Sequence, residues 1–194
     1  MLLLIPVLSP AEAALPPLEM MLADRALGSE TAKVTIIEYS SLTCPHCADF
    51  HRETLPQIKA AYIDTGQVRY IVRDFPLERR ALAAATVARC LPPDRYFGFV
   101  DMLFRDQQAW ARGDNLLADL KVRAQLAGLS AADFDACISD KGLIDGIQAK
   151  AAEGSTKNGI NSTPTFLVNG TTLSGALPYD DYRAAIEKAL DKAH

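Results

Sequence analysis

Two cysteines three positions apart stand between a β-branched run and a helical segment. The run, residues 34–39, reads Val-Thr-Ile-Ile-Glu-Tyr and predicts a buried strand. The motif CPHC follows a short loop at residues 44–47, and its Pro45 suits the first turn of a helix. At this spacing Cys44 and Cys47 share one helix face, close enough to bridge. The pattern predicts a strand-to-helix turn that carries a redox-active cysteine pair.

Strand signals stand near both ends of the chain. A helix is expected from Pro45 to about Asp64, kinked at Pro56, and residues 68–72 then predict a second strand. This β-α-β order favours a parallel pair with a right-handed crossover. Two more strands are expected at 165–168 and 171–173, joined by a hairpin turn at 169–170. A closing helix is expected at 179–193.

The segment 77–157 has no strand pattern and is predicted to be a helical insertion. Its expected helices lie near 78–91, 94–109, 114–127, 130–139 and 141–157, separated by Gly and Pro. The predicted fold class is therefore α/β, with helices on both faces of a central sheet and an all-helical domain inserted. We expect the sheet domain to consist of residues 14–76 and 158–194.

Charge and the N-terminal residues bear on location and partners. The chain has 194 residues and a formal net charge of -4, so no basic surplus exists to bind nucleic acid. Residues 1–13 carry an apolar run that ends in Ala11-Glu12-Ala13, the small-x-small pattern read by signal peptidase. The run is too short to span a bilayer and lacks a leading basic residue. We expect a signal-peptide remnant whose start lies upstream; an apolar leader on a cytosolic protein is the alternative.

The two cysteines of the motif are expected to have different roles. Unpaired backbone N–H groups and the helix dipole favour a thiolate at Cys44, which lowers its pKa and makes it the reactive group. Cys47 lies one turn further into the helix, where we expect it to be more buried and to act as the resolving thiol. His46 adds a candidate cation or hydrogen-bond donor beside the Cys44 sulfur.

Two further candidates lie outside the motif. Thr163-Pro164 precedes a strand about 120 residues after the motif. A cis proline there could pack against the disulfide and expose the Thr163 backbone to an extended substrate, and a trans proline at a strand start is the alternative. Glu38 lies in an otherwise apolar strand. If buried, it could relay protons to Cys47, and an edge or surface position is equally compatible with the sequence.

A zinc site is the main chemical alternative for the motif. Cys44, His46, Cys47 and His51 are ligand types that zinc uses. The second CxxC or HxxxH pair is absent, however, and helical spacing turns His46 away from the cysteine face. We therefore expect neither a metal nor a cofactor, and His51 is predicted to be a solvated helix residue.

These residues resemble the DsbA-like thiol oxidases of the bacterial periplasm, of the alphaproteobacterial type. The resemblance rests on residues 38–39, 44–50 and 163–170 and covers nearly all of 30–192. It implies a thioredoxin-like fold with an inserted helical domain. It also implies a periplasmic, monomeric protein dithiol:disulfide oxidoreductase that donates a disulfide to unfolded or reduced exported proteins. A DsbB-type membrane protein would then reoxidise it.

The same resemblance assigns roles to single residues. It implies that Cys44 is the nucleophile, Cys47 the resolving thiol and His46 a residue that tunes Cys44. It also implies that Thr163-Pro164 is the substrate-pairing turn and that Glu38 is the buried acid. Cys44 and Cys47 would form the redox-active disulfide. Cys90 and Cys137 lie in the insertion, where some relatives carry an additional structural disulfide. Such a bridge would close a loop of some 48 residues and contribute roughly 3–4 kcal/mol; in a cytosolic protein both thiols would be free and buried.

The sequence leaves other functions open. A disulfide isomerase or reductase would use the same motif, although residues 14–32 are too short for the N-terminal dimerisation domain that such isomerases usually add. A peptide-binding chaperone would use the surface near Pro164 and not the thiols. A cytosolic transferase or isomerase of related fold is a fourth class, whose members generally lack CxxC. Thr163, in place of the valine of the best-known relatives, could hydrogen-bond the Cys44 sulfur and shift the redox balance.

Overall fold

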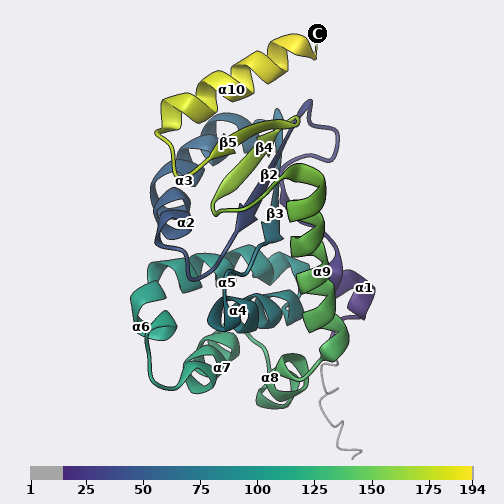
Figure 1. The fold of residues 1–194 in the computed structure, drawn as a ribbon, viewed down its shortest axis with the longest axis vertical. Helices are drawn as coiled ribbons and strands as arrows, with labels where there is room; N and C mark the ends of the chain where they lie inside the picture. Colours follow the sequence, from purple (N-terminus) through teal and green to yellow (C-terminus); the bar gives the residue numbers. More distant parts are fainter. Residues whose placement is uncertain (1–14, 194) are drawn as a thin grey trace, which may run out of the picture.

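A five-stranded mixed sheet lies at one end of the molecule, in the computed structural model, which describes residues 15–193 (Figure 1). Its strands follow the order β1-β3-β2-β4-β5. They are β1 Arg25–Leu27, β2 Val34–Ser40, β3 Val68–Asp74, β4 Thr165–Val168 and β5 Thr171–Ser174. As the β-α-β order predicted, β2 and β3 are parallel. The other pairs are antiparallel: β1 with β3, β4 with β2, and β5 with β4.

Helices cover both faces of this sheet. The helical elements outside the first crossover are α1 Leu18–Leu22, α4 Arg79–Cys90, α5 Pro93–Arg105, α6 Gln107–Ala111, α7 Leu116–Leu126, α8 Ala131–Ile138, α9 Lys141–Asn158 and α10 Tyr179–Lys192. On one face α10 packs on β2 and β4, and the rings of Phe50, Phe166 and Tyr182 stack within the core. On the other face α9 packs on β3.

The crossover after the CPHC motif is one helical rod with two wide turns. It consists of α2 Pro45–Asp49, the π-helical segment η1 Phe50–Thr54, α3 Leu55–Ile58 and a second π-helical segment η2 Lys59–Ile63. The expected helix from 45 to about 64 is confirmed. Pro56 has no N–H to donate to Arg52, and η1 ends two residues before it. The rod buries the apolar positions Cys47, Phe50, Leu55, Ile58 and Tyr62.

The helices α4–α8 form a layer of their own beyond the end of the sheet (Figure 1). The predicted α/β fold with an all-helical insertion is confirmed, and the segment expected at 94–109 divides into α5 and α6. Domain boundaries at 77 and 157 stay a prediction, since α9 contacts α4 at one end of its path and β3 at the other. Helix α9 approaches β2 closely: a Cβ at Gly154 would meet the Tyr39 ring at 2.5 Å.

A buried charge cluster joins the sheet to the helical layer. Arg89 of α4 donates from Nε to Asp74 Oδ2 of β3 at 2.6 Å, and its guanidinium also donates to the Val72 carbonyl. Arg25 of β1 donates to the Arg89 carbonyl, and both guanidinium groups lie over the Tyr96 ring of α5. Two cations and one carboxylate therefore share a site with little access to water.

The N-terminal part holds two elements that the sequence analysis did not assign. Helix α1 and the antiparallel strand β1 lie within residues 14–32. Both elements are short and lack a clear hydrophobic period, so pattern alone does not reveal them. The expected signal-peptide remnant at 1–13 lies outside the described residues. Within 15–193, no helix has the length and apolar character needed to cross a membrane.

In the helical layer, a disulfide joins Cys90 at the end of α4 to Cys137 of α8. The two Cα atoms lie 6.1 Å apart, and 47 positions separate the cysteines in the sequence. Both residues are fully buried.

Candidate active site

The CPHC motif forms the first turn of α2, at the carboxyl end of β2. Cys44 is the N-cap residue in an extended conformation, and Pro45 occupies the first helical turn as predicted. The Cys44 amide donates to the Ser41 carbonyl at 3.0 Å, and the Cys44 carbonyl accepts from the Ala48 amide at 3.2 Å. Cys44 and Cys47 are free thiols; Cys44 is 7% exposed and Cys47 has no exposed surface.

Local hydrogen bonds stabilise a thiolate at Cys44. The Cys47 thiol makes the largest contribution, followed by the Thr163 side chain and the backbone N–H groups of Cys47 and His46. Burial acts in the opposite direction, but these donors together lower the pKa of Cys44 from 9.0 to about 5. At neutral pH this sulfur is therefore largely the reactive thiolate.

The distant turn Thr163-Pro164 lies against the Cys44 sulfur. The peptide bond between these two residues is cis, and the Cys44 Sγ lies 3.4 Å from the Thr163 carbonyl, to which the thiol form donates. The Thr163 hydroxyl is buried and makes no other hydrogen bond within the described residues, so it is free to donate to the thiolate. The Pro164 carbonyl accepts from the Gly175 amide at 2.8 Å. The fold thus unites two segments that the sequence separates by 119 positions.

Cys47 lies in the opposite environment. Burial raises the pKa of its thiol well above 9.0, and the hydrogen bond to Cys44 and the nearby Glu38 charge raise it further. A hydrogen bond with Ser40 offsets part of this effect. At neutral pH Cys47 is therefore a neutral thiol that donates to its partner. It must lose a proton before it can attack.

Glu38 is buried on the face of β2 that carries the motif, with no exposed surface. Its Oε2 accepts a hydrogen bond from His51 Nε2 at 2.9 Å and another from the Tyr70 hydroxyl. Of the two environments that the sequence allowed, the structure has the buried one. The prediction for His51 was wrong: its side chain is 4% exposed, because it points to Glu38 and not to solvent.

His46 and the zinc alternative complete the list of candidates in and near the motif. The His46 side chain is 74% exposed, and its Nδ1 lies 3.9 Å from Asp49 Oδ2, so the contact that lowers the pKa of Cys44 comes from its backbone. With His51 bound to Glu38, the four zinc-type ligands are not gathered around one point. No group of three or more His, Cys, Asp or Glu suited to a metal occurs among residues 15–193.

The sequence did not predict a contact with the thiol site or its carboxyl group for three residues: His51, Tyr70 and Gln107. His51 follows Cys47 by four positions, a spacing that places both on one helix face, and this signal was present in the sequence. Tyr70 is opposite Ile36 in the parallel register and shares its face with Glu38. Gln107 of α6 donates to the Leu42 carbonyl at 2.8 Å and to the Cys44 carbonyl at 3.0 Å. No sequence pattern indicates this last contact, because it crosses from the insertion to the motif.

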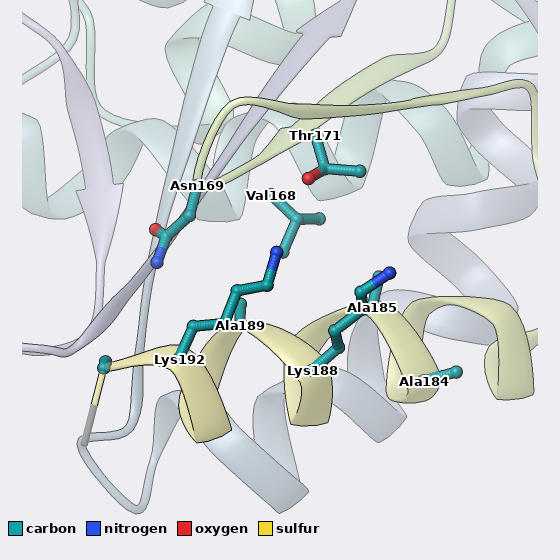
Figure 2. Close-up of a pocket in the computed structure, with 9 residues that line it drawn as sticks. Val168, Asn169, Thr171, Ala184, Ala185, Lys188, Ala189 and Lys192 are labelled. Atoms are coloured by element: carbon teal, nitrogen blue, oxygen red, sulfur yellow. The ribbon is translucent and has the colours of Figure 1, made fainter.

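A surface hollow elsewhere in the molecule does not share this chemistry. It lies between the β4–β5 hairpin and α10, and Figure 2 shows the side chains of Lys188 and Lys192 extending from α10 into the gap. Its lining holds no cysteine, histidine or carboxylate. It lies at the end of β4 remote from Pro164, beside Val168 and Asn169. The thiol pair is therefore the candidate active site.

Known proteins share both the fold and the sequence of this chain. Residues 21–188 match the family model described as thioredoxin. The crystal structure of alpha-DsbA1 from Wolbachia pipientis superposes with a TM-score of 0.81 and is 35% identical, over 88% of this chain and 92% of that one. The chain belongs to the thioredoxin family and is DsbA-like.

Two further relatives place this DsbA-like chain among proteins named for disulfide chemistry. A Rickettsia felis protein, provisionally named a protein-disulfide oxidoreductase, is 31% identical over 170 residues. The match covers 87% of this chain but 61% of that protein, so the DsbA-like chain spans less than two thirds of it. Disulfide bond formation protein D of Bacillus subtilis is 27% identical over 177 residues, which cover 84% of this chain and 76% of that protein.

Proposed function

We propose that this DsbA-like chain is a protein dithiol:disulfide oxidoreductase that introduces disulfide bonds into exported proteins. The observation that carries the proposal is the asymmetry of the thiol pair: the pKa of Cys44 is lowered to about 5, and that of Cys47 is raised. The names of the Rickettsia and Bacillus relatives support the same chemistry.

The reaction starts from the Cys44–Cys47 disulfide. A substrate thiolate attacks Cys44 Sγ, the bond to Cys47 breaks, and Cys47 leaves with the electron pair. A second substrate thiolate then attacks the substrate sulfur of the mixed disulfide, and Cys44 leaves as its stabilised thiolate. Two substrate thiols are oxidised to a disulfide, and the enzyme pair gains the two electrons. Cys44 is attacked first because Cys47 is buried.

The direction of electron flow follows from the stability of the reduced form. A pKa of about 5 stabilises the Cys44 thiolate at pH 7 roughly a hundredfold relative to an ordinary thiol. For a two-electron couple this raises the reduction potential by on the order of 60 mV. Reduced enzyme is thereby favoured, so the oxidised form tends to pass its disulfide on. This supports an oxidase in preference to a reductase.

Roles for the surrounding residues are part of the proposal. The turn Thr163-Pro164 would pair with an extended stretch of substrate beside Cys44, with Thr163 tuning the thiolate. Glu38 would exchange a proton with Cys47. His46 would tune Cys44 through its backbone N–H. Each role rests on the contacts around the sulfur atoms described above.

The cellular setting is also a proposal. The Cys90–Cys137 disulfide suits an oxidising compartment, which supports a periplasmic location. The clients would be unfolded or reduced exported proteins, and the chain would work as a monomer. Because each turnover leaves two electrons on Cys44 and Cys47, a further oxidant is required, and a DsbB-type membrane protein is the partner that the family resemblance implies.

A redox titration of Cys44–Cys47 against glutathione, paired with refolding of reduced and of scrambled ribonuclease, tests the proposal. An oxidase is expected to be reduced readily by glutathione and to reactivate reduced ribonuclease. Cys44→Ser should abolish this activity, and Cys47→Ser should trap mixed disulfides. A strongly reducing potential would overturn the oxidase assignment, and efficient unscrambling would indicate an isomerase. Peptide binding that survives in Cys44→Ser without any thiol exchange in the wild type would indicate a chaperone.

A further inference from the structure

The two oxygens of the Glu38 carboxyl group have different surroundings. Oε2 accepts hydrogen bonds from His51 Nε2 and from the Tyr70 hydroxyl. Oε1 is buried and has no hydrogen-bond partner among the described residues. Cys47 is near enough for the Glu38 charge to act on its thiol. One oxygen of the carboxyl group is thus fixed and the other is free.

We infer that His51 is a positioning residue for proton transfer at Cys47, acting with Tyr70 to fix Glu38 through Oε2 so that Oε1 exchanges the proton. The inference rests on the proposed function, because it concerns how the buried thiol is protonated and deprotonated during disulfide exchange.

Burial explains why the carboxyl group needs these two donors. An ionised carboxylate without hydrogen bonds in a site closed to water is strongly unfavourable. Hydrogen bonds donated to its oxygens stabilise the charged form. Two donors on Oε2 therefore satisfy this oxygen inside the core and fix the orientation of the carboxyl group. Without one of them, the buried group would lose a hydrogen-bond partner.

The His51 ring is held in place by packing from both parts of the molecule. It lies edge-on to Phe50 of the same helical rod, with ring centroids 5.7 Å apart. It also lies against Phe104 of α5 with centroids 4.4 Å apart. A ring enclosed in this way cannot swing away from Glu38 without disturbing the core. The donor geometry is therefore built into the fold.

Proton and electron balance assign each group a task. When a substrate thiolate attacks Cys44, the Cys44–Cys47 bond breaks and its electron pair passes to Cys47. The proton on Glu38 Oε1 moves to the Cys47 sulfur, and the resulting carboxylate is held by His51 and Tyr70. In reoxidation the proton returns to Oε1, and the Cys47 thiolate attacks the Cys44 sulfur of a mixed disulfide. The bond from Cys44 to the partner sulfur breaks, and that sulfur leaves as a thiolate with the electron pair. His51 keeps its own Nε2 proton throughout and acts only through Glu38.

Reaction of the reduced protein with oxidised glutathione separates the two steps. Cys44 first forms a mixed disulfide with glutathione, and Cys47 then displaces it; acid quenching and mass spectrometry count both species. In His51→Leu, which has no donor, the second step should slow by roughly tenfold or more, as for loss of acid–base assistance. The first step should stay within about twofold, and the glutathionyl species should accumulate.

Two variants decide whether the hydrogen bond or the packing matters. His51→Gln retains an N–H donor and is expected to restore the second step to within about threefold of the wild type. Phe99→Leu removes buried volume from α5, the helix that packs against His51, and should leave both steps unchanged. Thermal unfolding of each variant reports the loss of stability.

Each result has a definite meaning. The inference is overturned if Cys47 displaces glutathione at the wild-type rate in His51→Leu. It is also overturned if this rate falls equally in His51→Leu, His51→Gln and Phe99→Leu. If His51→Leu does not fold, Tyr70→Phe decides: slow displacement by Cys47 supports the inference, and a wild-type rate overturns it. If the wild type forms no Cys44–Cys47 disulfide, the proposed function fails and the inference fails with it. Normal exchange in the wild type with an unaffected His51→Leu removes the inference alone.

Discussion

Cys44 and Cys47 are neighbours on one helical turn, yet their surroundings differ in the balance of donors and burial. Cys44 receives hydrogen bonds from Cys47, Thr163 and two backbone amides, whereas Cys47 is enclosed near the buried Glu38. The difference does not arise from residue type, since both are cysteines. It arises from the N-terminal position of Cys44 on α2 and from the turn that packs against it.

Alkylation should reveal the asymmetry directly. With the pKa of Cys44 lowered to about 5, reaction of the reduced protein with iodoacetamide at Cys44 is expected to rise with pH to a plateau, with its midpoint near pH 5. Cys47 should remain unmodified across this range because its thiol is buried and its pKa is raised. Mass spectrometry of peptides from protein quenched at each pH measures both. A Cys44 midpoint near 9 would contradict the structure.

The stability of the reduced protein should also depend on pH. The pKa of Cys44 is about 5 in the folded state and 9.0 as an ordinary thiol, so its contribution is complete above pH 9 and is lost as pH falls through 5. At pH 7 the contribution is on the order of 3 kcal/mol. Above pH 9 the raised pKa of Cys47 acts in the opposite sense. Urea unfolding of the reduced protein minus that of Cys44→Ser, from pH 4 to 10, should show this rise.

At this scale the sequence predicted the thiols and the turn, but not their complete surroundings. Cys44, Cys47 and Thr163-Pro164 carry specific motifs, so their proximity could be expected. Glu38 could be buried or exposed, because a single carboxylate in a strand does not indicate whether helices cover the sheet face on which it lies. His51 was predicted to be solvated because its partner Glu38 lies in another element, and only the folded chain brings the two together.

Among the elements, the short helix α6 reaches the active-site loop from the helical layer. Gln107 donates from Nε2 to the carbonyls of Leu42 and Cys44, and the side chain is buried. The Cys44 carbonyl has a second partner in the Ala48 amide. Gln107 thus ties the loop before the motif to the insertion.

Replacement of Gln107 by Leu is expected to destabilise the protein by about 1–3 kcal/mol, since a buried carbonyl loses its donor. Gln108→Leu, at the exposed neighbouring position, is the matched control and should stay within about 0.5 kcal/mol. Chemical denaturation measures both variants. Equal effects at the two positions would show that the hydrogen bonds of Gln107 contribute no more than an exposed side chain.

Element prediction succeeded where a hydrophobic period was long or a turn had a distinctive sequence. Strand β4 matches its predicted range 165–168, and the Asn169-Gly170 turn lies between β4 and β5 as expected. Strand β1 has three residues and became a strand only through pairing with β3, a contact that its own sequence does not encode. The π-helical segments were not predicted either, and the kink expected at Pro56 stays a prediction.

For the whole molecule, the Cys90–Cys137 disulfide links α4 and α8 within the helical layer. The double variant Cys90→Ala, Cys137→Ala removes a bridge between positions 47 apart and should lose about 3–4 kcal/mol on the chain-entropy model. Exchange at Cys44 should be retained at temperatures where the variant is folded. Thermal unfolding and a thiol-exchange assay test the two statements separately. Loss of exchange in the folded variant would show that the bridge also shapes the active site.

The charge cluster between the sheet and the helical layer predicts a second stability effect. Asp74→Asn would remove the buried carboxylate to which Arg89 donates, and we expect a loss of about 3–5 kcal/mol. Asp24→Asn removes the partner of the partly exposed Arg73 and should cost about 1 kcal/mol or less. Denaturant unfolding compares the two. Similar small losses would mean that the buried cations are stabilised by Tyr96 and the backbone carbonyls alone.

The overall fold could be predicted because the order of strand and helix signals, together with the paired motifs, fits few topologies. The way in which the parts are joined could not be predicted. Contacts such as Arg89 with Asp74, or Gln107 with Leu42, connect residues whose separation carries no pattern. They depend on how the helical layer docks onto the sheet.

Helix α9 has a consequence for modularity. It belongs by sequence to the predicted insertion 77–157, yet it covers the sheet face that carries Tyr39, at a distance that only Gly154 permits. The predicted insertion 77–157 is therefore not a unit that could be cut out to leave a smaller working protein, because the loss of α9 would strip one face of the sheet. Shortened versions of this chain would have to keep or replace α9. A host protein that receives the insertion would have to provide a sheet on which α9 can pack.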